Sequence, residues 1–274
     1  MHWQLPTGPL DLSGPLFIGI LNVTPDSFSD GGLYLAASAA LDQAQCLVDS
    51  GVHILDLGAE STRPGAESVS PKEEWRRLEP VLKALRHHLP KTPLSVDTRH
   101  TETARRALEM GISILNDVTG FSDPQMLALA QSSDCGLIAM RSRRKNGVLL
   151  MPPYDKATQI TVDPIIDELI VLKNRIRNNR IDDQRVILDP GFGFGTTFQE
   201  DLALWKALPQ LPKKLEWPVE QFCIGISRKR FLACRAGRKA LPPLERDALT
   251  AQAHQEAFAW GYRNFRTHRA KLEL

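Results

Sequence analysis

Cysteine is scarce in this sequence, and the placement of the few that occur excludes two kinds of site. The four cysteines, Cys46, Cys135, Cys223 and Cys234, form no CxxC pair, and each of the first three lies in or beside an apolar segment. A buried free thiol is the expected state of a cysteine in such a segment. The sequence therefore predicts neither a disulfide framework nor a zinc site.

Long apolar runs and an excess of one charge are also missing. No run is long enough to span a bilayer, and the first residues lack the basic start and apolar core of a signal peptide. A formal net charge of +2 and a pI near 8.4 are too close to balance to indicate nucleic-acid binding. We therefore expect a cytoplasmic protein with neither a membrane nor a nucleic-acid partner.

What is present is a recurring unit of strand, polar loop and helix. The expected strands lie at residues 17–21, 52–57, 93–96, 112–115, 136–140, 185–188, 222–226 and 264–267. The expected helices lie at residues 36–50, 70–89, 102–110, 124–132 and 164–179. Short strands rich in Ile, Leu and Val that alternate with helices favour an α/β fold, a single (β/α)8 TIM barrel, over a doubly wound open sheet.

One domain is expected, with an N-terminal segment at residues 1–16 that forms a small hairpin and a barrel at residues 17–274. The last strand lies so near the end of this sequence that the last barrel helix is expected to be shortened or missing. Apolar surface around Leu249–Trp260 would then be uncovered, because a parallel barrel needs both faces covered. We expect the N-terminal segment or a partner subunit, in a possible homodimer, to cover it.

The stretch at residues 189–195 (DPGFGFG) follows the apolar run 186–188, so an acid stands at a strand exit before a glycine-rich turn. Glycine allows the backbone to turn sharply, with Phe192 and Phe194 held between the glycines. One interpretation is a ligand-facing strand end with a carboxylate and an aromatic wall. The other is a turn in which Asp189 only caps the next element.

Other expected strands also end in polar residues, which meet at one face of a barrel. The residues brought there are Asn22, Asp56, Thr62, Arg63, Asp97, Asn116, Met140, Asp189, Phe194, Lys229, Arg266 and His268. The acids and Asn116 could accept hydrogen bonds from the N–H groups along the edge of a flat heterocycle. Phe194 and Met140 could pack against its faces. The basic members suit a phosphate or another anion. Asp56 could instead bond only backbone at the barrel top, and His268 could be a solvated surface residue.

Seven motifs occur along residues 17–268 in a fixed order: NVTPDSFSDGG (22–32), ESTRPGA (60–66), SVDT (95–98), LND (115–117), DPGFGFG (189–195), SRK (227–229) and RTH (266–268). Together they resemble the dihydropteroate synthase family of folate biosynthesis. The resemblance implies a pterin-binding TIM barrel and a transferase that is a sulfonamide target. Its reaction condenses 6-hydroxymethyl-7,8-dihydropterin pyrophosphate with p-aminobenzoate and releases pyrophosphate, with magnesium as the metal.

The resemblance also implies roles for individual residues. The pterin edge would be held by Asp97, Asn116, Asp189 and Lys229, with Met140 and Phe194 beside the ring. The pyrophosphate would be held by Asn22, Arg266 and His268, with Asn22 also serving the magnesium. The p-aminobenzoate pocket would be formed by Phe28, Thr62, Arg63 and Pro64. The expected catalytic residues are therefore Asp97, Asp189, Lys229, Arg266 and His268. Catalysis would consist mainly of stabilising the leaving group and positioning the substrates.

Three arginines depart from the family's pattern: Arg141 replaces a His, Arg230 a Ser, and Arg269 an Asp. Arg230 would pair with the p-aminobenzoate carboxylate if it pointed inward, and would be a solvated charge if it pointed outward. The departures motivate an alternative function as a non-catalytic or regulatory pterin-binding paralogue. A pterin-dependent methyltransferase is a further alternative, which the basic residues suit less well than a leaving pyrophosphate.

Overall fold

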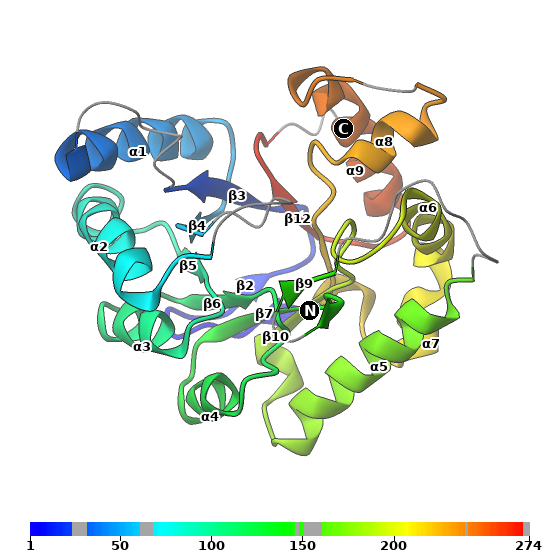
Figure 1. Ribbon diagram of the computed structural model, residues 1–274, viewed down its shortest axis with the longest axis horizontal. Helices are drawn as coiled ribbons and strands as arrows, with labels where there is room; N and C mark the ends of the chain where they lie inside the picture. The colour runs from blue at the N-terminus through cyan, green and yellow to red at the C-terminus, as the bar shows by residue number, and fades with distance from the viewer. Residues whose placement is uncertain (24–31, 61–67, 146–147, 151–160, 239–240, 271–274) are drawn as a thin grey trace.

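Eight parallel strands form the main sheet of the structure, a computed structural model that describes residues 1–23, 32–60, 68–145, 148–150, 161–238 and 241–270 (Figure 1). In chain order the strands are β3 (Leu16–Asn22), β4 (Ile54–Gly58), β5 (Leu94–Asp97), β6 (Ile114–Asp117), β7 (Gly136–Met140), β10 (Val186–Asp189), β11 (Cys223–Ile224) and β12 (Asn264–Thr267). Their spatial order is β10-β7-β6-β5-β4-β3-β12-β11, and a parallel bridge between Leu188 and Phe222 joins the two ends. The predicted closed barrel is confirmed.

Helices follow the strands and cover the outside of the barrel (Figure 1). They are α1 (Gly32–Asp49), α2 (Pro71–His88), α3 (Thr101–Glu109), α4 (Pro124–Ser132), α5 (Asp163–Asn178), α6 (Phe198–Ala207), α7 (Leu211–Leu215), α8 (Arg230–Arg235) and α9 (Asp247–Ala259). Local signals explain several starts: the Ser70 side chain caps α2, Asp123 caps α4, and Thr197 and Glu200 form a capping box at α6. None of these described helices combines the length and the apolar content that crossing a bilayer requires.

The N-terminal segment forms the predicted hairpin, in which β1 (His2–Trp3) pairs antiparallel with β2 (Leu10–Asp11). Trp3 and Leu5 are buried against the inward-facing isoleucines of the barrel strands, such as Ile114 and Ile138. A second antiparallel pair, β8 (Arg144–Lys145) with β9 (Val148–Leu149), follows β7. The hairpin therefore contributes to the core inside the barrel, while the outward-facing strand residues pack under the helices in a separate cluster.

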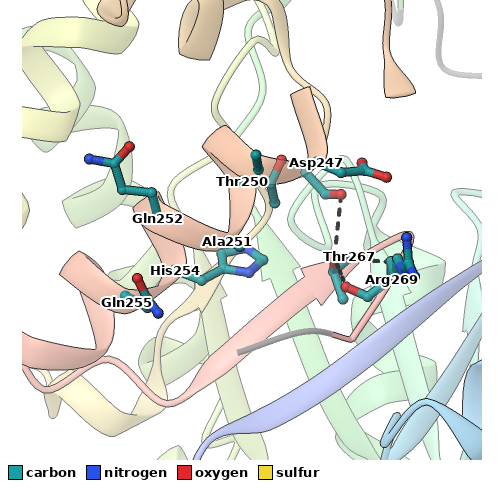
Figure 2. Close-up of a pocket in the computed structure, with 10 residues that line it drawn as sticks. Asp247, Thr250, Ala251, Gln252, His254, Gln255, Thr267 and Arg269 are labelled. Atoms are coloured by element: carbon teal, nitrogen blue, oxygen red, sulfur yellow. Dashed lines mark hydrogen bonds between the residues drawn. The ribbon is translucent and has the colours of Figure 1, made fainter. Parts of the chain in front are cut away.

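The stretch Leu249–Trp260, where an uncovered apolar surface is expected, is buried on one side and borders an open pocket on the other. Ala253 and Ala257 of α9 are fully buried, and the ring of Trp260 packs at a tilt against that of Trp205, with 5.2 Å between the ring centres. The open side of α9 borders a pocket of about 380 Å³ that is lined by polar side chains, such as Thr250 and Gln252, and by apolar groups, such as Ala251 (Figure 2). The N-terminal hairpin packs with the residues inside the barrel, and coverage of α9 by a partner subunit stays a prediction.

All four cysteines are free in the structure. Cys135 and Cys223 are buried, but Cys46 is exposed on α1, contrary to the expectation from its apolar neighbours. The buried face of α1 is formed by Ala44 and Leu47, and Cys46 lies between them in sequence and so turns away from it.

Candidate active site

The register of the barrel brings the predicted polar residues to one end of adjacent strands. Asn22 of β3 is paired with Gly58 of β4, and Gly58 with Asp97 of β5. Asp97 is paired in turn with Asn116 of β6. On the other side of the barrel, Met140 of β7 is paired with Asp189 of β10. These residues lie at or next to the carboxyl ends of their strands, so the loops that follow them surround a common site.

Arg266 of β12 joins two of the acids. Its Nε donates to Asp56 Oδ2 at 2.7 Å, and its Nη2 donates to Asp97 Oδ2 at 2.7 Å. Asn116 Nδ2 also donates to Asp56 Oδ2, at 2.9 Å. Asp56 therefore binds side chains of the site, rather than serving only as a backbone acceptor. Its other oxygen, Oδ1, is buried and has no hydrogen-bond partner within the described chain.

One guanidinium between two acids leaves an excess negative charge. Burial raises the pKa of Asp97 to about 7, helped by the charge of Asp56 and opposed by Arg266. Burial alone would lower the pKa of Arg266, but the two carboxylates raise it, so Arg266 stays charged. Near neutral pH Asp97 can therefore hold a proton. When that proton leaves, the carboxylate can accept a hydrogen bond from a ligand.

Asp189 and Lys229 form a second half of the site. Asp189 is 3% exposed, and its Oδ1 accepts from the Gly191 N–H at 2.7 Å. Burial raises its pKa, while Lys229 opposes that shift. Burial likewise lowers the pKa of Lys229 to about 8, with Asp189 opposing. The Lys229 ammonium donates to the Phe192 carbonyl and lies 4.6 Å from the ring centre of Phe194.

Gly225, just after β11, leaves room for this acid. A Cβ atom there would lie 2.9 Å from Asp189 Oδ2. The two halves of the site are close, since the charge of Arg266 acts on the pKa of both Asp189 and Lys229. The second interpretation of Asp189, a cap of the next element, is not what the structure shows, because Thr197 caps α6.

His268 is half-buried beside Ser227, rather than a solvated surface residue. Its Nδ1 lies 3.1 Å from Ser227 Oγ, and its backbone N–H donates to the same oxygen at 3.2 Å. Ser227 also lines the pocket beside α9, so that pocket adjoins the site at this corner. Ser227 is the first residue of the SRK motif, but it was not among the predicted site residues.

Four predicted site residues, Phe28, Thr62, Arg63 and Pro64, lie outside the described residues. The two ends of the loop after β4, at Glu60 and Ser68, are described. They are joined by a network of polar side chains that was not predicted from the sequence. Arg99 donates to both oxygens of Glu60 at 2.8 Å and to Ser68 Oγ at 2.8 Å. Glu60 also accepts from the Val69 N–H at 3.2 Å. The basic residues Arg99 and His100, directly after the SVDT motif, are the sequence feature from which this network could have been predicted.

The three departing arginines do not enter the acid cluster. Arg141 is buried and turns to the backbone of the 189–195 turn, whereas Arg230 and Arg269 are exposed. The motive for a non-catalytic alternative is thereby weakened, because Arg141 bonds carbonyls of the turn and the other two arginines are exposed. The charge of Arg141 also opposes the burial that raises the pKa of Asp189.

Exposure of Arg230 at the first residue of α8 favours the outward orientation. We therefore predict that Arg230→Ser leaves the ratio of the KM for p-aminobenzoate to the Ki for a sulfonamide unchanged, because a solvated cation contributes equally little to both. Steady-state kinetics of the two proteins measures this ratio. A shift toward tighter sulfonamide binding in the Ser variant would mean that Arg230 turns inward when the substrate binds.

A buried acid behind the site gives a pH prediction. Glu74 of α2 is fully buried, with Oε2 accepting from Thr98 Oγ1 at 2.8 Å, and burial raises its pKa from 4.5 to about 7. The folded protein then holds a proton that the unfolded chain has lost, so stability falls as the pH rises between these values. Glu74→Gln should reduce this pH-dependent fall in the free energy of unfolding by up to about 3 kcal/mol.

Denaturant unfolding at several pH values between about 5 and 8 tests this dependence. The difference between wild type and variant isolates Glu74 from the other groups that titrate in the range. Glu79→Gln on the same helix is the control, because Glu79 pairs with Lys83 and its pKa is lowered out of this range. Parallel stability curves for wild type and Glu74→Gln would show that Glu74 stays ionised when folded.

The geometry defines a class of protein: a TIM barrel with buried carboxyl groups, an amide and cations gathered at the carboxyl ends of its strands. The family described as pterin binding enzymes matches residues 18–268 of this sequence, and the chain belongs to that family.

Individual relatives agree with this assignment. A dihydropteroate synthase of Streptococcus pyogenes serotype M6 is 39% identical over 258 residues, which are 93% of this chain and 90% of that protein. The structure of Xanthomonas albilineans dihydropteroate synthase with 4-aminobenzoic acid is similar with a TM-score of 0.83 and 34% identity, covering 98% of this chain and 93% of that one. The Thermus thermophilus enzyme in complex with 6HMPPP has a TM-score of 0.78 and 34% identity, covering 98% and 94%.

Proposed function

We propose that this chain is a dihydropteroate synthase, which condenses 6-hydroxymethyl-7,8-dihydropterin pyrophosphate with p-aminobenzoate and releases pyrophosphate. The observation that best supports the proposal is the buried acid cluster at the barrel mouth, with Asp56 Oδ1 lacking a partner in the described chain. A buried acceptor without a donor is costly, and a ring N–H of a ligand would satisfy it. The function of the family's relatives agrees with this chemistry.

The pterin is held by its hydrogen-bonding edge in this proposal. Asp56 through Oδ1, together with Asp97, Asn116 and Asp189, would face that edge as acceptors, with Lys229 as a donor. Met140 is 7% exposed at the end of β7, and the Phe194 ring already contacts the Lys229 ammonium, so both can flank the ring. Binding the ring in this way fixes its exocyclic methylene relative to both the leaving group and the incoming amine.

The bond change itself needs little proton transfer. The C–O bond between the methylene and the pyrophosphate breaks, and its electron pair leaves with the pyrophosphate. The p-aminobenzoate nitrogen forms the new C–N bond and then loses a proton to water. Arg266 and His268 stabilise the charge that develops on the pyrophosphate. Arg266 shares its guanidinium with Asp56 and Asp97, so the acids hold it in place for the anion.

Magnesium is the metal that this reaction is proposed to use. The described residues contain no group of three or more His, Cys, Asp or Glu that could hold a metal ion. Magnesium commonly binds through one or two protein oxygens and substrate phosphates instead of a complete protein cage. The half-buried Asn22 at the end of β3 offers such an oxygen, so the residues fit an ion brought by the pyrophosphate. When bound, it would neutralise charge on the leaving group.

Turnover should therefore stop after exhaustive chelation and return when magnesium is added, because Arg266 and His268 alone neutralise the pyrophosphate incompletely. Product formation before and after chelation measures this. Full turnover in the chelated enzyme would show that the protein cations are sufficient.

The function itself is tested by incubating the purified chain with both substrates and identifying the products. Dihydropteroate and inorganic pyrophosphate are expected in equal amounts. Binding of the pterin pyrophosphate without product would instead support the pterin-binding paralogue.

A further inference from the structure

The turn at residues 189–195 is held by a buried arginine from the neighbouring strand end. Arg141 follows β7 and is 3% exposed. Its Nε donates to the Pro190 carbonyl at 2.7 Å, and its Nη2 donates to the carbonyls of Gly191 at 2.7 Å and Phe194 at 3.3 Å. One guanidinium thus binds three carbonyls of a single turn. A rigid planar donor set of this kind fixes the positions of its acceptors.

Ion pairs hold this arginine in turn. Arg141 Nη1 lies 2.9 Å from Glu168 Oε2 of α5, and the other Glu168 oxygen lies 2.6 Å from Arg143 Nε. Arg143 continues the network to Glu200 of α6 at 2.5 Å and donates to the Gly195 carbonyl at 3.3 Å. The turn is therefore tied through Arg141 and Arg143 to two helices outside the barrel.

The turn needs such support because of its own sequence. Gly191, Gly193 and Gly195 all have positive φ, at 73°, 73° and 79°. A run of glycines has many backbone conformations to lose, so its ordering depends on external contacts. The contact is close: a Cβ atom at Gly191 would lie 1.9 Å from the Arg141 carbonyl oxygen. Replacing that glycine would force the turn and the strand end apart.

The turn positions three groups of the site. It begins at Asp189, it presents the Phe194 ring 4.6 Å from the Lys229 ammonium, and the Phe192 carbonyl accepts from that ammonium. We propose that Arg141 is a positioning residue for the pterin substrate, which fixes the 189–195 turn so that Asp189, Phe194 and Lys229 meet the ring together. The inference rests on the proposed function, because it names the substrate half that depends on the arginine.

Three variants and a matched control test this role. Arg141→Met removes all donors, Arg141→Lys keeps the charge without the three-carbonyl geometry, and Glu168→Gln removes the ion pair that holds the arginine. Arg185→Met is the control. Arg185 also donates to two backbone carbonyls, those of Cys135 and Ala130 at 2.9 Å, but it lies before β10, at the opposite end of that strand from Asp189.

The quantities to measure are the calorimetric Kd for the pterin pyrophosphate, the KM for p-aminobenzoate at saturating pterin, and the melting temperature. Arg141→Met should weaken pterin binding about tenfold or more, because small displacements of positioning groups have large effects. Arg141→Lys should lie between it and wild type, and Glu168→Gln should weaken binding about threefold. The KM for p-aminobenzoate should change less than about twofold in each variant. Arg185→Met should lower the melting temperature and leave the pterin Kd unchanged.

The result that overturns the inference is a pterin Kd equal to that of wild type in Arg141→Lys and Glu168→Gln, which perturb the fold least. Equal losses of affinity for both substrates would also overturn it, because a general loss of structure would then be the cause. A wild-type chain that fails to bind the pterin pyrophosphate would be a different result, since it would remove the proposed function itself.

Discussion

Arg266→Met should lower the free energy of unfolding by about 3–5 kcal/mol, because it leaves buried carboxylates without their partner. Asp56 is fully buried and Asp97 is 19% exposed, and each accepts from the guanidinium at 2.7 Å. Turnover should be lost as well, since the same guanidinium is proposed to meet the pyrophosphate. The loss of stability should be larger at pH 8 than at pH 5, because the pKa of Asp97 is near 7 and its protonation relieves the repulsion.

Two further variants separate stability from chemistry. Arg266→Met combined with Asp97→Asn should recover part of the stability but none of the turnover. Arg263→Met is a control on the same segment, because Arg263 donates to the carbonyls of Phe258 and Tyr262 before the start of β12. Denaturant unfolding at both pH values and a product assay are the measurements. Unchanged unfolding of Arg266→Met at pH 8 would contradict a charged Asp56 and Asp97 in the folded protein.

Asp189→Asn should weaken binding of the pterin pyrophosphate by about 1.5–3 kcal/mol, the usual value of a hydrogen bond to a charged group. This corresponds to roughly a 10- to 150-fold higher Kd. The substitution is nearly isosteric, and its remaining oxygen can still accept from the Gly191 N–H, so the melting temperature should change little.

Asp117→Asn is the matched control for Asp189→Asn. Asp117 is also a buried acid at a strand end, but it accepts from the backbone N–H groups of Thr119 at 2.7 Å and Phe121 at 2.8 Å. It should therefore affect stability and leave pterin affinity unchanged. Calorimetry that found the same pterin Kd in Asp189→Asn and wild type would remove Asp189 from the site.

Much of the fold could be predicted because its signals are local. The alternation of apolar strands and helices gave β7 and β12 with their observed ends, and Pro124 after Asp123 gave α4. β11 is shorter than expected, covering Cys223–Ile224 of the predicted 222–226. There the chain leaves the ladder and turns, with the Lys229 N–H donating to the Ile226 carbonyl at 3.1 Å. Such a departure depends on tertiary contacts, and hydrophobic periodicity along the sequence gives no information about them.

The sequence could predict which side chains lie at the strand ends, but not how they pair with one another. Position at strand ends brought Asp56, Asp97 and Arg266 to one face, but no spacing rule indicated that one guanidinium would join both acids. The orientation of Arg141 was also hidden, because its acceptors are carbonyls some 49 to 53 residues away. The directions of side chains and the pairing of residues far apart in the sequence are determined only by the folded barrel.

A crystal structure of this chain with bound 6-hydroxymethyl-7,8-dihydropterin pyrophosphate would test the account most directly. The account predicts that the pterin edge lies within hydrogen-bond distance of Asp97, Asn116 and Asp189, with the pyrophosphate reaching Arg266 and His268. If the ligand lay instead in the pocket beside α9 and not at the barrel mouth, the account would be contradicted.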